Sequence, residues 1–209
     1  GPGLGLGLGL EAWISKFKMS AGSIPKVKLT EGINPLLIDG DIYAGKPNPH
    51  AWMSPKKAIY YVDKIVDAFI EIDPGGSDEY RSNASSYKAK LEALDKELRD
   101  SLSLIPKERR FLVTCEGAFS YLASDYGMKE AYLWPVNAES QVTPKRMVNL
   151  IRIIKDNNVP TIFCESTVSA EAQMEVARSS GASFGGTFYV DSLSEKDGPA
   201  PTYIDLLRH

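Results

Sequence analysis

Residues 111–134 read FLVTCEGAFSYLASDYGMKEAYLW, and this stretch contains two kinds of pattern. Short apolar runs at 111–115 and 131–134 indicate buried strands. Between them, residues 117–126 have a helical pattern that Gly127 ends. A strand, a helix and a second strand in this order predict a βαβ unit, in which both strands lie parallel in one sheet.

The same alternation continues towards the C-terminus. It predicts a helix over 143–158, a strand over 161–164, a helix over 169–180 and a strand over 186–190. Short buried strands that alternate with helices of about 10–15 residues indicate a parallel sheet covered on both faces. We therefore predict the α/β class.

Upstream, residues 77–105 have the most regular helical pattern in the chain, and Pro106 ends it. Apolar or small residues recur every three or four positions, at Tyr80, Ala84, Tyr87, Leu91, Leu94, Leu98 and Leu102. A helix of about 28 residues is ~40 Å long, enough to run the full height of a small protein. A coiled-coil strand is one interpretation. Because the pattern lasts only about four heptads and α/β patterns follow it, we predict a connecting helix packed along two lobes.

The N-terminal third has less uniform patterns. Residues 54–73 predict a helix that begins at Ser54-Pro55. The Pro- and Gly-rich residues 24–49 predict loops around a short strand over 27–30, and residues 11–20 predict a short helix.

Residues 1–10 read GPGLGLGLGL. We predict no strand there, because every second residue lacks a side chain and ordering glycine costs backbone entropy. We interpret the segment as non-native or altered, with a native low-complexity start as the alternative.

Composition narrows the classes of protein and partner. The 209 residues include 27 acidic and 24 basic ones, a net charge of −3, and no stretch is basic, which argues against a nucleic-acid partner. No apolar run approaches the ~20 residues of a membrane-spanning helix. The chain has two histidines, His50 and His209, and two cysteines. These numbers exclude a three-histidine centre within one chain and a multi-cysteine zinc module.

Three of the four strands predicted after residue 110 are followed by an acidic residue: Glu116, Glu165 and Asp191. In an open parallel sheet, ligands bind beyond the carboxyl ends of the strands, and these acids would share that edge. Any one of them could simply cap the next helix. Together they would repel one another unless a cation, a basic group or protons neutralised them, so this edge is the candidate site.

Cys115 and Cys164 occupy matching places, each directly before one of the glutamates. If their strands are neighbours, the two Cα atoms could lie within the ~4.4–6.8 Å that a disulfide allows. Two buried free thiols, or a reactive thiol, are the alternatives. A disulfide would place the protein in an oxidising compartment.

His50 lies in the sequence NPHAWMSP, residues 48–55. A single histidine is more often structural than a metal ligand. The flanking prolines stiffen the backbone and fix the direction of the imidazole, which suits a ligand whose donor atom must be held in place.

Four motifs, taken in order, resemble the metal-binding solute receptors of ABC importers, the TroA-like family. They are NPHAW at 48–52, VTCEGAF at 113–119, FCESTV at 163–168 and VDSL at 190–193. The resemblance covers about residues 11–209. It implies two α/β lobes with parallel sheets, joined by one long helix, with a metal ion held between the lobes.

The family's ligands are two histidines, a Glu or His, and an Asp. Carried over by motif, they imply His50, Glu116 and Asp191 as metal ligands. Glu165 has no ligand role in the family, so we expect it to support a ligand or to cap a helix. The family's first histidine precedes a segment that resembles residues 10–13, where this chain has only GPGLGLGLGL. We therefore expect an incomplete N-terminal lobe, and weak metal binding or none.

The predicted organisation has four parts. They are the altered segment 1–10, the remainder of the N-terminal lobe over 11–76, the connecting helix over 77–105 and a C-terminal α/β lobe over 106–209.

The resemblance also implies a function and a location. A periplasmic or extracytoplasmic protein would capture a divalent metal ion for an ABC permease. It would contact the membrane only through the permease or through a lipid anchor outside these residues. Two carboxylates with an imidazole suit Mn²⁺ or Fe²⁺ better than a dedicated Zn²⁺ site, although intrinsic affinity favours Zn²⁺. The chain lacks the His-rich acidic loop usual in zinc-dedicated members. We therefore favour Mn²⁺, with Zn²⁺ or Fe²⁺ as alternatives.

Two other classes stay open. A metal-dependent hydrolase could use a metal-bound water, or Cys115 as nucleophile with His50 as its base. Against it, no second histidine or lysine lies near the acids to act as a general base. An adhesion or interaction protein of the same fold is the other alternative. We predict a binding protein rather than an enzyme.

Overall fold

The computed structural model describes residues 3–5, 26–28, 33, 34, 36, 48, 50–135 and 142–189. Its strands are β1 (Gly3–Gly5), β2 (Lys26–Lys28), β3 (Phe111–Glu116), β4 (Lys129–Trp134), β5 (Thr161–Glu165) and β6 (Ser183–Phe188). Its helices are α1 (Pro55–Ile72), α2 (Ser77–Ser103), α3 (Ser120–Asp125), α4 (Pro144–Asp156) and α5 (Glu171–Ser180). Short 3₁₀ turns are η2 (His50–Met53), η3 (Pro74–Gly76) and η4 (Lys107–Arg109). The helix predicted over 11–20 lies outside the described residues.

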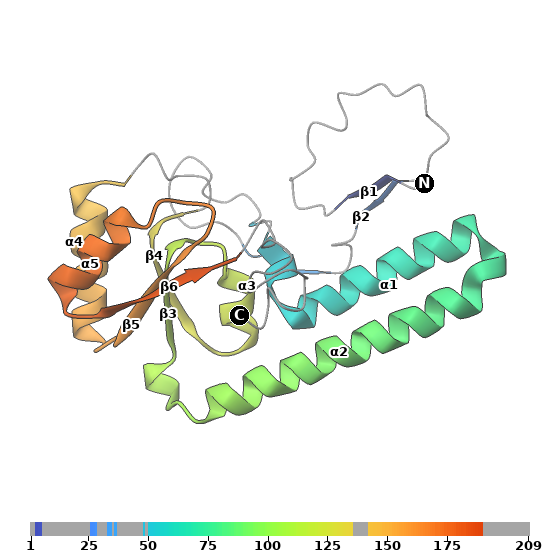
Figure 1. Ribbon diagram of the computed structural model, residues 1–209, viewed down its shortest axis with the longest axis horizontal. Coiled ribbons are helices and arrows are strands. Elements are labelled where there is room, and N and C mark those ends of the chain that lie inside the picture. Colours follow the sequence, from blue (N-terminus) through green and yellow to red (C-terminus); the bar gives the residue numbers. More distant parts are fainter. Residues whose placement is uncertain are drawn as a thin grey trace, which may run out of the picture.

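The long helix α2 forms an antiparallel pair with α1, and the pair extends away from the sheets (Figure 1). Leu91 and Leu94 are buried, and the other five positions of the predicted stripe are half-buried. Near its C-terminal end the stripe packs against both α1 and the first residues after β3. The helix therefore joins two parts of one chain, as predicted, and is not a coiled-coil strand.

The strands after α2 are all parallel. β3 pairs with β4, and β5 pairs with β6. β3 lies beside β5, as the distance of 4.8 Å between the Cα atoms of Cys115 and Cys164 shows. The spatial order is therefore β4, β3, β5, β6. The chain leaves β3 in one direction to form β4 and returns past β3 to form β5, so the strand order reverses between β3 and β5.

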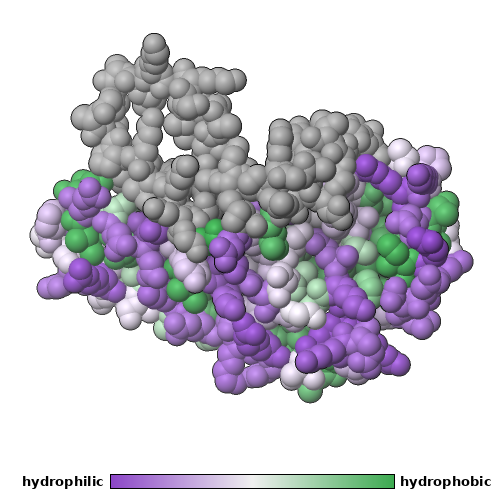
Figure 2. Space-filling model, turned by 180° about the vertical axis from the view of Figure 1, so that it is seen from behind, coloured by the Kyte–Doolittle hydropathy of each residue, from purple (hydrophilic) through white to green (hydrophobic). Residues whose placement is uncertain are grey.

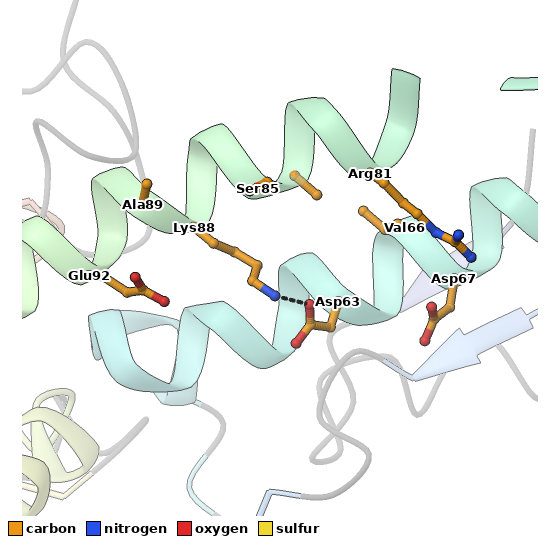
Figure 3. A pocket seen from close by; sticks show the side chains of 9 residues that line it. Asp63, Val66, Asp67, Arg81, Ser85, Lys88, Ala89 and Glu92 are labelled. Carbon is orange, nitrogen blue, oxygen red and sulfur yellow. Dashed lines mark hydrogen bonds and ion pairs between the residues drawn. The ribbon is translucent and has the colours of Figure 1, made fainter. Parts of the chain in front are cut away.

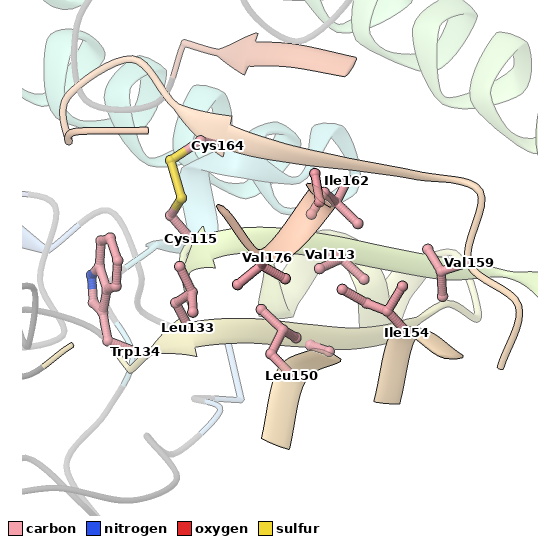
Figure 4. Packing of buried hydrophobic residues seen from close by; sticks show 12 residues of the cluster. Val113, Cys115, Leu133, Trp134, Leu150, Ile154, Val159, Ile162, Cys164 and Val176 are labelled. Atoms are coloured by element: carbon pink, nitrogen blue, oxygen red, sulfur yellow. A yellow bond between two sulfur atoms is a disulfide. The ribbon is translucent and has the colours of Figure 1, made fainter. Parts of the chain in front are cut away.

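Helices cover both faces of these strands, as predicted. The connection from β3 to β4 runs one way across the strands, and those from β4 to β5 and from β5 to β6 run the other way. Right-handed crossovers therefore place α3 on one face and α4 and α5 on the other. Along β3, Val113 and Cys115 pack against Leu150 of α4 and Val176 of α5 (Figure 4). Leu112 points the other way and contacts the cluster between α1 and α2. This alternation is the period of two that a strand buried on both faces requires.

Three elements differ most from their prediction. β1 forms within residues 1–10 and pairs in parallel with β2, so the expectation of no strand there is wrong. Ladder hydrogen bonds come from peptide groups and need no side chains. β6 begins three residues earlier than predicted, at Ser183. α3 begins at Ser120, because the N–H groups of Gly117 and Ala118 donate to Trp134 O and Glu116 O and form a turn instead.

The described surface is mostly polar. On the face in Figure 2, hydrophobic residues are interspersed among hydrophilic ones. Among the described helices, none combines the length and the apolar character needed to cross a membrane.

Gly185 of β6 provides a test of the β5–β6 packing. A Cβ atom there would lie 2.4 Å from Phe163 Cε1 and 2.6 Å from Thr161 Cγ2. Gly185→Ala should force these groups apart and lower the free energy of unfolding by about 1–3 kcal/mol, measured by urea denaturation. The control is Gly75→Ala, whose new Cβ would lie 3.6 Å from Asp73 Oδ1, an ordinary contact. A Gly185→Ala protein no less stable than the control would contradict this packing.

Candidate metal centre

Two of the three predicted edge acids end neighbouring strands. Glu116 is the last residue of β3 and Glu165 the last of β5. The strand order reverses between these strands, and in open α/β sheets the crevice at such a point is where ligands bind. Asp191, the third acid, lies outside the described residues.

Directly before these glutamates, a disulfide between Cys115 and Cys164 joins β3 to β5 (Figure 4). Both cysteines are buried and neither is a free thiol. The predicted pairing is confirmed, and the alternatives of free or reactive thiols are wrong. The hydrolase hypothesis thereby loses its thiol nucleophile, because a disulfide sulfur carries no thiolate.

Two further side chains hold the junction between β3 and β5. Gln173 of α5 donates from Nε2 to Thr114 O (3.0 Å) and to Phe163 O (2.9 Å), one carbonyl on each strand. The carboxyl oxygens of Glu165 lie 3.2 and 3.1 Å from the backbone nitrogen of Glu116, which donates to them. The carbonyl of Glu116 accepts from Thr114 Oγ1 at 2.9 Å. The backbone of the predicted ligand Glu116 is therefore fixed on both sides, while its side chain stays half-buried.

Glu165 is almost fully buried, with 1% of its surface exposed. Burial raises the pKa of its carboxyl to about 8, and the charge of Glu116 acts in the same direction. The hydrogen bond from the Glu116 N–H opposes this shift without reversing it. At pH 7 the Glu165 carboxyl is mostly protonated. A proton thus neutralises Glu165, one of the crowded acids. The contact between the two glutamates is from the backbone N–H of Glu116 to the carboxyl of Glu165.

His50 opens the turn η2 and is buried, with 4% of its surface exposed. Burial lowers the pKa of its imidazole to about 4, so the ring is neutral at pH 7, which is the state that binds metals. Asn48 Oδ1 accepts from the His50 backbone N–H (3.0 Å) and lies 2.9 Å from His50 Nδ1. Asn48 Nδ2 donates to Gly117 O at 2.9 Å. Since Gly117 follows Glu116, one amide links His50 to the end of β3.

Among the described side chains, one group of three possible donors is compact enough for a single ion. It consists of Cys115, Cys164 and Glu165, with donor atoms within 4.8 Å of one another. The disulfide takes both sulfurs out of coordination chemistry, because thiolates are the metal ligands. The structure brings His50 and Glu116 to the same end of β3, and the full set with Asp191 stays a prediction.

Three residues that organise this region have no role that was predicted from the sequence. Asn48 stood in a quoted motif, and asparagine before proline often bonds to the backbone two residues later, which was the available signal. Gln173 and Tyr121 meet partners 59 and 73 residues away, and no local pattern marks them.

A surface groove lies elsewhere, between α1 and α2 (Figure 3). It is lined by Asp63, Val66, Asp67, Arg81, Ala84, Ser85, Lys88, Ala89 and Glu92. Charges of both signs face it, and Lys88 Nζ lies 2.7 Å from Asp63 Oδ1. Such exposed pairs contribute about 0–1 kcal/mol, and we interpret the groove as the solvated seam of the helix pair.

The chain matches a known protein family over most of its length. Residues 4–209 match the model of the ZnuA family, described as zinc-uptake complex component A, periplasmic. The chain belongs to the ZnuA family. The resemblance inferred from the four motifs is therefore confirmed.

Named relatives of this ZnuA-family chain bind several metals. The iron-binding protein YfeA of Yersinia pestis is 50% identical over 201 residues, which cover 96% of this chain and 65% of YfeA. The chain thus spans just under two thirds of that relative's length. A manganese-bound periplasmic metal binding protein of Candidatus Liberibacter asiaticus superposes with a TM-score of 0.88 at 39% identity, over 98% of this chain and 76% of that one. The periplasmic zinc binding protein TroA of Treponema pallidum gives a TM-score of 0.84 at 26% identity, over 99% and 76%.

These comparisons confirm the α/β fold class. The family consists of substrate-binding proteins of metal transport rather than enzymes. Neither the hydrolase nor the adhesion hypothesis gains support from them.

Glu165 generates a prediction for the pH dependence of stability. Its pKa rises on folding from the usual 4.5 to about 8, so between these values the folded protein binds more protons than the unfolded chain. Stability should therefore fall as pH rises from about 5 to about 8, by at most about 1.4 kcal/mol per pH unit. Glu165→Gln should flatten this dependence and make the protein more stable than wild type at pH 8.

The measurement is urea unfolding of the metal-free, disulfide-intact protein across that range. Glu92→Gln, at an exposed acid of α2, is the control and should keep the wild-type slope. A Glu165→Gln protein with an unchanged slope would show that Glu165 is not the titrating group.

Proposed function

We propose that this protein captures a divalent transition-metal ion in the periplasm, or at an extracytoplasmic surface, and delivers it to an ABC permease. One observation carries the proposal. A buried, neutral imidazole, His50, is tied through Asn48 to the end of β3, where Glu116 stands at the reversal of strand order. Membership of the ZnuA family and the names of the relatives support it.

The proposed ligands are His50, Glu116 and Asp191. An imidazole that is already neutral need not lose a proton before it binds a cation. Glu116 supplies a carboxylate. Its backbone is already fixed by hydrogen bonds to Glu165 and Thr114, so metal binding would need to order little more than the Glu116 side chain. Asp191, three residues after the last residue of β6, would supply the second negative charge. Together the two carboxylates would balance a doubly charged ion.

Mn²⁺ is the favoured cargo. Two carboxylates and one imidazole form a harder donor set than a histidine-rich site, and oxygen donors suit Mn²⁺ and Fe²⁺. The relatives are named for iron, manganese and zinc, so Fe²⁺ and Zn²⁺ remain alternatives. We expect Zn²⁺ to bind as well, because intrinsic affinity for nitrogen and oxygen donors favours Zn²⁺ over Mn²⁺.

The proposed role of this site is capture rather than catalysis. A hydrolase would need a general base beside the metal, and the two buried groups nearest to the end of β3 are unsuited to that task. Burial keeps His50 neutral through a low pKa, which makes it a weak base, and keeps Glu165 protonated. Glu165 and the disulfide would instead support the position of Glu116.

Replacing the proposed ligand Asp191 tests the assignment. Asp191→Ala should lower the affinity for Mn²⁺ at least tenfold, because it removes one charge and one donor. The measurement is a calorimetric titration with MnCl₂, on this chain and on the full-length protein that contains it. Asp156→Ala is the matched control, since Asp156 is an exposed acid at the C-terminal end of α4, before β5 begins.

His50→Ala and Glu116→Ala complete the series and should each weaken Mn²⁺ binding as strongly. Full-length variants that bind Mn²⁺ like the Asp156→Ala control would refute the proposed ligand set. Competition with ZnCl₂ and Fe²⁺ in the same titrations ranks the three metals.

A further inference from the structure

Asn48 is held from several directions. It is 3% exposed. Its backbone N–H donates to Leu36 O at 2.7 Å, and its carbonyl accepts from the Tyr121 hydroxyl at 2.5 Å. The same hydroxyl accepts from Leu36 N at 3.1 Å. The Tyr121 hydroxyl of α3 thus bonds to the backbone of both Leu36 and Asn48. These bonds fix the backbone position from which the Asn48 side chain extends.

The orientation of the Asn48 amide follows from its partners. Its Nδ2 lies 2.9 Å from Gly117 O, an oxygen that can only accept. Its Oδ1 lies 3.0 Å from the His50 backbone N–H, which can only donate. Turning the amide over would place two acceptors together at one end and two donors at the other. Two buried hydrogen bonds therefore select one orientation.

This orientation decides which nitrogen of His50 carries the hydrogen. Oδ1 also lies 2.9 Å from His50 Nδ1, and an amide oxygen has no hydrogen to give. Nδ1 must therefore be the donor, and in a neutral ring the lone pair is then on Nε2.

We propose that Asn48 is a positioning residue for metal capture, which holds the His50 ring in the tautomer with hydrogen on Nδ1 and so presents Nε2 as the donor atom to the metal. The inference rests on the proposed function, because it takes His50 as a ligand. It goes beyond it by assigning the ligand atom and the residue that selects it. The Gly117 carbonyl thus fixes the orientation of the Asn48 amide, and the amide fixes the tautomer of His50. Glu116, the residue before Gly117, is the other proposed ligand from this region.

An uncharged amide has a further consequence. A carboxylate in this place would raise the basicity of the ring and strengthen its binding to metals generally. The amide orients the imidazole without adding charge, so the ring contributes direction while the charge of the site comes from the carboxylates.

The first experiment reads the tautomer without any metal. The chain has two histidines, so a His209→Ala background leaves His50 as the single imidazole. Long-range ¹H–¹⁵N correlation spectra at pH 7 should show a protonated Nδ1 and an unprotonated Nε2. Asn48→Ala should change this to a mixture of tautomers. Asn48→Asp keeps an acceptor towards His50 and should keep hydrogen on Nδ1.

The second experiment reads affinity for MnCl₂ in the same series by calorimetry. Asn48→Ala should lose about 10–100-fold, and Asn48→Asp should bind at least tenfold more tightly than Asn48→Ala. Ser54→Ala is the matched control, because Ser54 is equally buried on the same segment but donates to Asp125 at 2.6 Å. It should lower stability and leave both tautomer and affinity unchanged.

The outcomes separate this inference from the proposed function. An Asn48→Ala protein that keeps hydrogen on Nδ1 overturns the inference, and the tautomer arm reaches this result even where Mn²⁺ binding is weak. Equal losses of affinity in Asn48→Ala and Asn48→Asp overturn the positioning role. A His50→Ala protein with wild-type affinity overturns the ligand set itself, whatever the tautomer.

Discussion

The junction between β3 and β5 is the constraint on which this structure depends. These neighbouring strands belong to separate ladder pairs among the described residues, so side chains make the connection. The disulfide joins the two cysteines, Gln173 bonds a carbonyl on each strand, and Glu165 accepts from the Glu116 N–H. The four side chains that make these links are at most 1% exposed, and leaving a buried polar group without its hydrogen bond would cost about 1–3 kcal/mol. Their combined effect is to place the ends of both strands, and hence the candidate site, in one fixed relation.

The second constraint comes from the opposite face. A right-handed crossover puts α3 on this face, where α1 and α2 also pack, and α3 carries Tyr121 towards the segment that precedes α1. Through Tyr121 and Gly117, the region after β3 holds Asn48, which in turn holds His50. Ser54, the last residue before α1, and Lys57 in the first turn of α1 bond to Asp125 at the other end of α3. The imidazole and the carboxylate proposed to share a metal are therefore positioned by one short stretch of chain, although 66 residues separate them in sequence.

Much of this architecture could be predicted from sequence because it follows local periodicity. The stripe of α2, the start of α1 at Ser54-Pro55 and the matching cysteines at two strand ends are all visible within short windows. The features that were predicted wrongly or missed depend instead on backbone hydrogen bonds or on distant partners. β1 is built by peptide groups that leave no side-chain pattern, and α3 starts late because backbone bonds to Trp134 and Glu116 override its helical pattern. Asn48, Tyr121 and Gln173 depend on partners far along the chain, which no single window contains.

Burial explains why the residues around the end of β3 are better suited to binding a cation than to catalysing a reaction. Desolvation disfavours whichever form of a group is charged, and here it makes a histidine and a glutamate neutral at pH 7. This arrangement disfavours general-base catalysis, because the low pKa of His50 makes its imidazole a weak base and the Glu165 carboxyl already carries a proton. A receptor gains, because the imidazole keeps its lone pair and the protonated Glu165 does not compete with Glu116 for positive charge. The half-buried Glu116 is then left at the boundary with solvent, where a carboxylate can exchange water for a metal ion without the full cost of burying a charge.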